Sequence, residues 1–478
     1  MKKHSLVKVL TILLLLVVVT TYFIAGRDGE VSYLALGDVF INYVQSFYYF
    51  FDTVIFILVV GGFYGLLNKT KAYRKLIDTV VKKFSNNKKM FVIAVTIIFA
   101  LVASLTGLDM ILLIFIPFVV SIILLLGYDK LVALSATVVA TLVGFIGGIF
   151  TAVRTSSGFS TFETFVGLDG KWENVFPRIL LLLVVVGLLV LYIVRYIKKL
   201  ESDKSKDEIS SSDALLIETK KDGKTVKVDY DGVKVWPLIT ILSIMIVLLV
   251  LGFIPWNSLF EVSVFSDFHE WITGLSIGNY AVFTDLISSN FPAFGEWATL
   301  GVFMMPILII AFFSLIIKFV YKIKLDSVLD AFVLGVKKMI PAAIVVALAY
   351  SVLVCAYNNG FMETIITNAG DKFADNVIVN SLIAMLGCVV NVDLYYIASG
   401  IFSPITATLS DGANLRVYAI AFQSLYGLVS LIGPTSVLLI TGLAYLDVPY
   451  TKWVKYIWRF VLELFIVIFV IMIIVTLL

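Results

Sequence analysis

The chain has 478 residues, of which 60% are hydrophobic and 14% are charged, with a formal net charge of +3. This composition predicts a polytopic membrane protein, because most of such a chain must be solvated by hydrocarbon rather than by water. The net charge is too small to indicate a nucleic-acid partner. Cys355 and Cys388 lie in apolar segments, and the histidines are His4 and His269 alone, so we expect neither a disulfide framework nor a histidine-ligated metal.

The first apolar run extends from Leu6 to Ala25, with Lys2 and Lys3 before it and Lys8 near its start. It is either a signal peptide or a retained transmembrane helix. No convincing small-x-small cleavage site precedes the Gly-Arg-Asp that ends it, so we expect a retained helix with a cytoplasmic N-terminus.

The loops between apolar runs alternate in charge, and loops rich in Lys and Arg resist export. We therefore expect the basic loops to be cytoplasmic, together with a serine-rich linker of mixed charge, and the acidic loops to lie outside. The cytoplasmic loops are expected at 68–89, 202–234, 318–338 and 452–459. The outside loops are expected at 28–38, 255–297 and 363–375. The predicted location is the cytoplasmic membrane, with multiple passes.

The apolar runs predict an all-α fold of about nine transmembrane helices plus two re-entrant hairpins. The simple spans are expected near 6–25, 48–67, 131–152, 177–197, 237–254, 298–317, 340–357, 415–446 and 460–478. Two longer runs, 90–127 and 376–412, exceed the roughly 20 residues that a bilayer requires, and each is split by a polar turn. Re-entrant hairpins fit the loop charges, and two short full-length helices remain the alternative for each run.

The two halves of the chain look like repeats. Placing Pro117 on Pro404 puts Gly147 on Pro434, and an amphipathic segment precedes each hairpin. The flanking charges are basic in one copy and acidic in the other, so we expect the copies to be inserted in opposite orientations, which is typical of transporters. The expected organisation is an N-terminal helix and outside loop (1–47), a first repeat (48–197), a cytoplasmic linker (198–236), connecting helices (237–339) and a second repeat (340–478).

An apolar helix is interrupted by Gly-Pro-Thr-Ser at 433–436 and then resumes. Backbone that is broken inside lipid must line a cavity or bind a ligand, which points to a carrier. Glycine allows non-helical backbone, and the half-helix that follows Pro434 can face an anion. Because paired glycines in membrane helices more often serve tight packing, Gly147, Gly148, Gly433 and Pro434 are interpreted as the architecture of the site.

Several motifs resemble one family of carriers. They are Gly-Pro-Thr-Ser-Val-Leu at 433–438, Val-Pro-Tyr-Thr-Lys-Trp-Val-Lys at 448–455, Gly-Gly-Phe-Tyr-Gly at 61–65 with Asn-Lys-Thr at 68–70, Ile-Phe-Ile-Pro at 114–117 and Leu-Gly-Tyr-Asp at 126–129. In wording and order they are similar to the YfcC-type and anaerobic four-carbon-dicarboxylate carriers of the ion transporter superfamily. The resemblance covers most of the chain from Gly61 onward, and the C-terminal motif is its most specific part.

The resemblance implies two inverted repeats, each with a hairpin and an unwound helix that meet at a central site. It also implies a homodimer with a fixed scaffold and a mobile transport domain, as in elevator-type transporters, and amino acids or small carboxylates as substrates. This sequence departs from the family at the site itself. Thr106, Gly107 and Asp109 stand near the expected paired acids, residues 391–395 replace a Ser-Gly-Ser-Gly type turn, and Thr151 with Ala152 replaces an Asn-Pro.

Asp109 and Asp393 are the strongest candidates for ion coupling. A carboxylate at the centre of a membrane costs about 3 kcal/mol and normally pairs or titrates. Each could bind Na⁺ together with freed carbonyl groups, or carry a proton, so the expected coupling ion is Na⁺ or H⁺ and no other cofactor is expected. The alternative is that each aspartate only caps a half-helix.

The remaining candidates are polar residues near the turns and the helix breaks. The substrate-binding set is Thr106, Thr151, Arg154, Ser156, Ser157, Asn391, Gln423, Thr435 and Ser436. Arg154 can grip a carboxylate through two parallel hydrogen bonds, or it can be an arginine that snorkels at the outer end of a helix. The aromatic residues 47–51 and Trp453, Tyr456 and Trp458 are interpreted as interfacial anchors.

The sequence therefore predicts a secondary active transporter that moves a small carboxylate or amino acid by alternating access, by Na⁺ or H⁺ coupling or by exchange. One alternative is a cation/proton antiporter without an organic substrate. Another, from a different class, is a membrane-embedded transferase, although no nucleophile, metal ligands or acid cluster with suitable spacing supports an enzyme. No glycine-rich nucleotide loop is present to drive transport by ATP hydrolysis.

Overall fold

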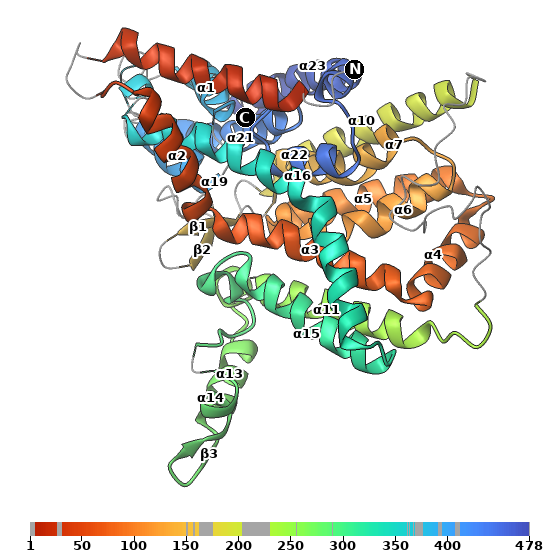
Figure 1. Ribbon diagram of the computed structural model, residues 1–478. Helices are drawn as coiled ribbons and strands as arrows, with labels where there is room; N and C mark the ends of the chain where they lie inside the picture. Colours follow the sequence, from red (N-terminus) through yellow and green to blue (C-terminus); the bar gives the residue numbers. More distant parts are fainter. Residues whose placement is uncertain are drawn as a thin grey trace.

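The computed structural model shows a helical bundle whose long helices run side by side (Figure 1). It describes residues 5–25, 31–149, 152–155, 158–161, 175–202, 230–254, 256–288, 290–360, 362, 364–366, 368, 376–390, 394–406 and 412–477. Over these residues, seven helices are long and apolar enough to span a membrane. They are α1 (Ser5–Ile24), α3 (Phe51–Lys69), α5 (Lys88–Thr106), α10 (Val175–Ser202), α11 (Trp236–Phe253), α16 (Leu325–Asn358) and α23 (Tyr450–Leu477). The predicted class, a multi-pass helical membrane protein, is confirmed.

Three expected spans are shorter or interrupted in the structure. The span expected at 131–152 is a run from α7 (Lys130–Leu134) through a π-helical turn (Ser135–Val139) to α8 (Ala140–Ile146). The span expected at 298–317 follows a short 3-10 helix (Trp297–Leu300) and is α15 (Met304–Val320). The span expected at 415–446 is divided into α21 (Gly412–Ser430) and α22 (Val437–Tyr445). The expected helix 340–357 is the second part of the longer α16, which contains Pro341.

The expectation that a helix continues to residue 152 is wrong. The run ends at Ile146, and residues 152–155 form the strand β1 (Ala152–Thr155), which pairs in antiparallel fashion with β2 (Gly158–Thr161). The physical reason lies at Gly147, where an added Cβ would lie 2.5 Å from Cα of Leu182. The backbone of α10 approaches too closely for a side chain at this position, and glycine also favours the end of the helix.

The helices α3 and α16 cross at a contact made of small residues. A Cβ at Gly65 would lie 2.1 Å from the carbonyl oxygen of Ala331, and one at Gly335 would lie 2.1 Å from that of Gly61. Gly61 and Gly65 are spaced for small-xxx-small packing, which lets two membrane helices meet backbone to backbone. Two further helices flank α3: α2 (Leu36–Tyr49), which the sequence analysis placed in a loop, and the amphipathic α4 (Lys71–Phe84).

The first long apolar run folds as α5, a 3-10 turn (Met110–Ile114) and α6 (Ile116–Leu125). Its two ends lie together, since a Cβ at Gly127 would be 3.8 Å from Nζ of Lys88. This return excludes a single tilted helix. The 10 residues of α6 are too few to cross a bilayer, which favours the re-entrant hairpin over two full-length helices.

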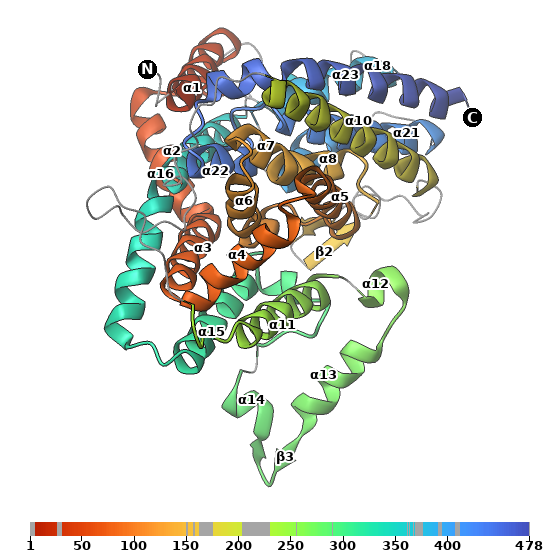
Figure 2. The same cartoon turned by 90° about the vertical axis from the view of Figure 1, so that its right-hand side faces the viewer.

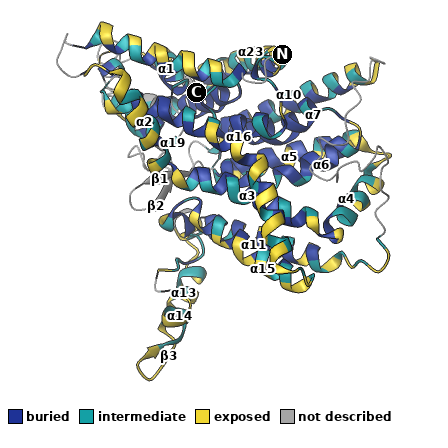
Figure 3. Ribbon diagram, viewed as in Figure 1, coloured by how far each residue is buried: buried dark blue, intermediate teal, exposed yellow. Residues whose placement is uncertain are grey.

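The second long apolar run contains α18 (Val377–Cys388), α19 (Leu394–Ile397), a π-helical turn (Ala398–Phe402) and α20 (Ser403–Thr406). As in the first run, a turn of non-α helix stands just before the proline-containing segment, with Pro117 in one and Pro404 in the other. Residues 391–393 and 407–411 lie outside the described part of the chain. Figure 3 shows that α6 is largely buried, whereas α1, α11 and α15 expose many side chains.

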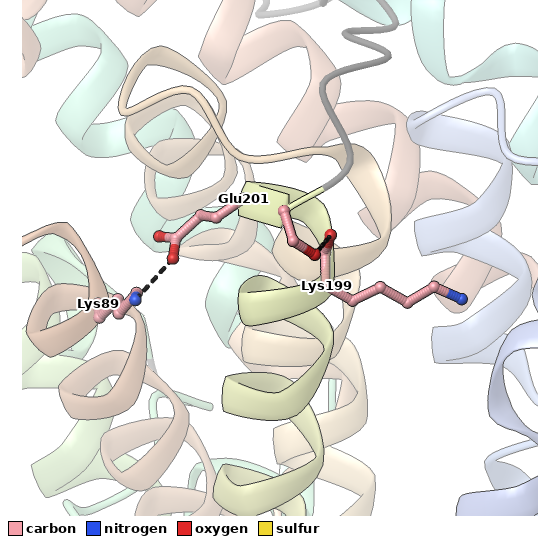
Figure 4. A network of polar contacts seen from close by, with 4 residues as sticks. Lys89, Lys199 and Glu201 are labelled. Carbon is pink, nitrogen blue, oxygen red and sulfur yellow. Dashed lines mark hydrogen bonds and ion pairs between the residues drawn. The ribbon is translucent and has the colours of Figure 1, made fainter.

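Three of the four segments that were predicted to be cytoplasmic meet at one face of the molecule. Nζ of Lys75 donates to the carbonyl oxygen of Val233 at 2.9 Å. The hydroxyl of Tyr321 donates to the carbonyl oxygen of Lys234 at 3.4 Å. Lys89 of α5 and Glu201 of α10 form an ion pair of 2.7 Å (Figure 4). Burial, with a smaller contribution from the charge of Glu201, raises the pKa of Tyr128 to about 12. The described ends of these loops therefore share one face, and their cytoplasmic location stays a prediction.

At the opposite face, the backbone N–H of Ser32 donates to the carbonyl oxygen of Asn359 at 3.3 Å. From this face α12 (Trp256–Phe260), α13 (Val264–Gly274), the strands β3 (Ser276–Ile277) and β4 (Tyr280–Ala281), and α14 (Val282–Leu286) extend away from the bundle. The strands form a two-stranded antiparallel sheet.

Candidate functional site

The first helix break follows α8 and is held by a serine of the first hairpin. The hydroxyl of Ser104 donates to the carbonyl oxygen of Gly147 at 2.9 Å. The backbone N–H of Ile149 donates to the hydroxyl of Ser104 at 3.2 Å and to its carbonyl oxygen at 2.9 Å. Backbone groups that leave a helix inside lipid need such partners. The end of α5 and the break after α8 therefore form one connected unit.

The second half of the chain also holds the first break. The side-chain amide of Gln423, on α21, donates to the carbonyl oxygens of Phe145 at 3.1 Å and Gly148 at 3.0 Å. The hydroxyl of Ser424 donates to the carbonyl oxygen of Ile146 at 3.0 Å. Gln423 and Ser424 are 1% and 0% exposed, so these bonds are shielded from water. Unmade hydrogen bonds in such a place are costly, which makes this contact a strong link between the halves.

The second break, between α21 and α22, is tied to the second hairpin and to α23. The hydroxyl of Thr435 donates to the carbonyl oxygen of Val389, just after α18, at 2.8 Å. The indole N–H of Trp453 donates to the carbonyl oxygen of Leu431 at 3.0 Å. The hydroxyl of Tyr450 donates to the carbonyl oxygen of Ile432. In each half, a side-chain hydroxyl thus joins a hairpin to a helix break.

Both breaks adjoin the same helix, α21. Gln423 contacts the first break, and the second begins after Ser430, which corresponds to roughly 11 Å along a helix axis. Gln423 holds the first break through its amide N–H groups, and its side-chain oxygen remains as an acceptor. Among the atoms that the structure describes, Oε1 of Gln423 has no hydrogen-bond partner. Its amide hydrogens are already engaged, so this atom can only accept a hydrogen bond or contact a cation.

Asp109 lies half-buried in the turn after α5, and its Oδ1 accepts from the backbone N–H of Met110 at 2.6 Å. At least one carboxylate oxygen of Asp109 therefore caps the helical turn that follows it, as the alternative to ion coupling predicted. The hydroxyl of Thr106 donates to the carbonyl oxygen of Val102 at 2.6 Å and accepts from the N–H of Leu108. Both predicted residues belong to the turn of the first hairpin, near Ser104.

The other predicted residues divide into two groups. Thr435 is 1% exposed, whereas Ser436 and Pro434 are half-buried and Gly147, Gly148 and Gly433 are buried. The second group lies outside the described residues: Thr151, Ser156, Ser157, Asn391 and Asp393, together with the side chain of Arg154. The structure brings Gln423 into contact with Gly148, and places Thr435 in the second break, which follows α21.

Sequence reasoning missed residues that hold the breaks: Ser104, Ser424, Arg178 and Tyr450. It also misread Trp453, which is 0% exposed and therefore buried rather than an interfacial anchor. The sequence could have indicated Arg178, because a charged residue stands there at the start of an apolar run. This arginine is 2% exposed, and its Nη1 lies 3.4 Å from the carbonyl oxygen of Ile149, to which it donates.

Several apolar helices, together with two helix breaks inside the bundle, are typical of membrane transporters. The profile of the C4-dicarboxylate anaerobic carrier (DcuC) family matches residues 39–477. The chain belongs to this family, and the resemblance that was noted from its motifs is confirmed.

Individual relatives are more distant. A putative basic amino acid antiporter, YfcC of Escherichia coli strain K12, is 21% identical over 418 residues, which are 84% of this chain and 73% of that protein. An uncharacterized protein of Haemophilus influenzae is 28% identical over 162 residues, which are 32% of this chain and only 29% of the Haemophilus protein.

Two solved transporters align along nearly the whole chain. The YdaH transporter of Alcanivorax borkumensis has a TM-score of 0.42 and 13% identity, and covers 99% of this chain and 98% of its own. MtrF of Neisseria gonorrhoeae, described within a class of antimetabolite efflux pumps, has a TM-score of 0.42 and 12% identity, and covers 98% and 94%.

Proposed function

We propose that this protein is a secondary active transporter that moves a small carboxylate across the cytoplasmic membrane by alternating access. The observation that carries the proposal is the link from Gln423 to Phe145 and Gly148, by which the second half of the chain holds the helix break of the first. Interrupted helices that meet inside the bilayer supply exposed backbone dipoles and polar groups for a substrate.

The chemistry of the first break favours an anion. Arg178 is a buried guanidinium at this break, and guanidinium groups match the geometry of carboxylates. The family description, a carrier of C4-dicarboxylates, agrees with that preference. The name of the Escherichia coli relative suggests a basic amino acid and exchange instead, so amino acids are the second candidate substrates.

The transport unit in this proposal comprises the two hairpins and the two break segments, arranged as inverted repeats. They would move together, as in elevator-type carriers, because Ser104 joins one hairpin to its break and Thr435 joins the other. The crossing of α3 and α16, where backbone meets backbone at Gly65 and Gly335, would be the fixed scaffold. Asp109 and Asp393 are the proposed sites of Na⁺ or H⁺ coupling.

The test is uptake into proteoliposomes with imposed gradients of Na⁺, H⁺ or internal substrate. Radiolabelled succinate is the first probe and arginine the second. We expect succinate uptake that is driven by one of these gradients and competed by other C4-dicarboxylates. Uptake of arginine alone would overturn the carboxylate assignment, and no uptake of any carboxylate or amino acid under any gradient would overturn the function.

Coupling is tested with Asp109→Asn and Asp393→Asn. If an acid couples the ion, its variant should lose concentrative uptake but keep downhill exchange of substrate. If both variants accumulate substrate as the unmodified protein does, neither aspartate couples the ion.

A further inference from the structure

A tyrosine at the crossing of α3 and α16 holds the turn of the first hairpin. Tyr64, the neighbour of Gly65, is 4% exposed, and its hydroxyl donates to the carbonyl oxygen of Ile114 at 2.6 Å. Figure 2 shows α6 of this hairpin beside α3. The bond joins two motifs of the sequence, Gly-Gly-Phe-Tyr-Gly at 61–65 and Ile-Phe-Ile-Pro at 114–117.

The carbonyl oxygen of Ile114 needs a donor from outside its own helical turn. Ile114 ends the 3-10 turn that separates α5 from α6. In a 3-10 turn this oxygen would accept from residue 117, which is a proline and has no N–H. A carbonyl group inside the bilayer must find its partner within the protein. The hydroxyl of Tyr64 is that partner.

Tyr357, near the end of α16, makes a similar contact with the second hairpin. Its hydroxyl donates to the carbonyl oxygen of Tyr396 in α19, and the two rings lie edge to face with their centroids 5.4 Å apart. A Cβ at Gly400, in the π-helical turn, would lie 2.1 Å from the hydroxyl oxygen of Tyr357. The hairpin therefore leaves room for this hydroxyl because residue 400 is a glycine.

The two contacts form a pair. Each joins a tyrosine on one helix of the crossing to a backbone carbonyl that precedes the proline of a hairpin, Pro117 or Pro404. A hydrogen bond is lost once its donor and acceptor separate beyond about 3.5 Å. A small shift of either hairpin along the crossing therefore breaks its bond. The contacts thus favour one position of the hairpins.

We propose that Tyr64 and Tyr357 are positioning residues that hold the two hairpins against the crossing of α3 and α16, and that both bonds break when the transport unit moves. This proposal rests on the proposed function, in which the hairpins move and the crossing stays fixed. Loss of one hydroxyl should shift the equilibrium away from the state that the structure shows roughly fivefold, which corresponds to about 1 kcal/mol.

A pair of cysteines at the second hairpin reports this state. The rings of Phe50 and Tyr396 lie 5.8 Å apart, and Phe50 stacks on Tyr350 of α16 at 3.7 Å, which ties it to the crossing. The double variant Phe50→Cys with Tyr396→Cys keeps the backbone carbonyl that accepts from Tyr357. We expect a short bifunctional methanethiosulfonate to bridge the pair, with the unmodified protein as the control for its buried cysteines, Cys355 and Cys388. The bridge should arrest succinate uptake until it is reduced.

Tyr64→Phe is then added to the cysteine pair, because its hydroxyl acts on the other hairpin. If the hairpins move as one unit, the initial rate of bridging should fall several-fold. Tyr192→Phe is the matched control, since it removes a hydroxyl that donates to the carbonyl oxygen of Tyr456, between α10 and α23. Both variants should lower the melting temperature, but the control should bridge at the rate of the cysteine pair alone.

The outcomes separate this proposal from the proposed function. The bridging rate requires no substrate, so it also tests the tyrosines in a protein without detectable uptake. Equal bridging rates for Tyr64→Phe and Tyr192→Phe, with uptake arrested by the bridge, would overturn the role of the tyrosines and leave the moving unit in place. Uptake that continues in the bridged protein would overturn both, because the hairpins would then not move against the crossing.

Discussion

The side-chain amide of Gln423 donates to the carbonyl oxygen of Gly148 at 3.0 Å, although the two residues belong to opposite halves of the chain. The same amide donates to Phe145, so one side chain closes two backbone acceptors of the first break. Gln423 was predicted to bind substrate. In the structure its N–H groups position the break, and only Oε1 is left to accept from a ligand.

Replacing Gln423 with alanine should destabilise the protein strongly. The carbonyl oxygens of Phe145 and Gly148 would each lose a donor where water cannot replace it, and each such loss costs about 1–3 kcal/mol. We expect a free energy of unfolding lower by about 2–4 kcal/mol, measured as a lower melting temperature in detergent. Gln45→Ala is the matched control, because the other glutamine of the chain makes an exposed contact to Asn358. Equal losses for both variants would contradict the positioning role.

Two substitutions of Thr435 separate the effect of its hydroxyl group from the effect of its size. Thr435→Val keeps the shape but removes the donor to Val389, and should cost about 1–3 kcal/mol of stability. If this bond couples the second hairpin to the second break, the initial uptake rate should fall with it. Thr435→Ser keeps the hydroxyl and should retain most of the uptake. Proteoliposome uptake rates of the two variants decide, and an unchanged rate in Thr435→Val argues against coupling through this bond.

The sequence predicted the course of the chain better than the ends of its helices. Hydropathy located the long helices, because the length and polarity of a spanning helix follow from the bilayer as solvent. The end of α8 was missed. It depends on the approach of α10 to Gly147, which is a contact between segments that no local pattern records.

The helix breaks of the candidate site were predicted in part, for a related reason. The Gly-Pro-Thr-Ser motif located the second break, since glycine and proline mark interrupted helices directly. Ser104 and Ser424 gave no such signal, because a serine in a membrane helix usually bonds to its own backbone, as Ser424 also does with Ile420. Trp453 was assigned to the interface by residue type alone, whereas the carbonyl oxygen of Leu431 holds it inside.

Arg178 should govern affinity for a carboxylate substrate. Lysine at this position keeps the charge but loses the planar fork that binds a carboxylate through two bonds. In Arg178→Lys we expect the KM for succinate uptake to rise about tenfold, which corresponds to about 1.4 kcal/mol, with a smaller change in the maximal rate. Arg195→Lys, at an exposed position of the same helix, is the control and should leave KM unchanged. An unaltered KM in Arg178→Lys would remove this residue from substrate recognition.

Gly65, at the crossing of α3 and α16, can be compared with Gly187, a glycine of α10 that has open space around it. At Gly65 an alanine Cβ would overlap the carbonyl oxygen of Ala331 at 2.1 Å, so Gly65→Ala should force the helices apart and lower the melting temperature. At Gly187 on α10, nothing lies within 4 Å of such a Cβ. Gly187→Ala should therefore be neutral or raise stability by up to about 1 kcal/mol, because alanine favours the helix. Thermal unfolding of both variants in one detergent checks the pair, and a Gly65→Ala protein as stable as the unmodified chain would show that this crossing tolerates separation and is not a rigid scaffold.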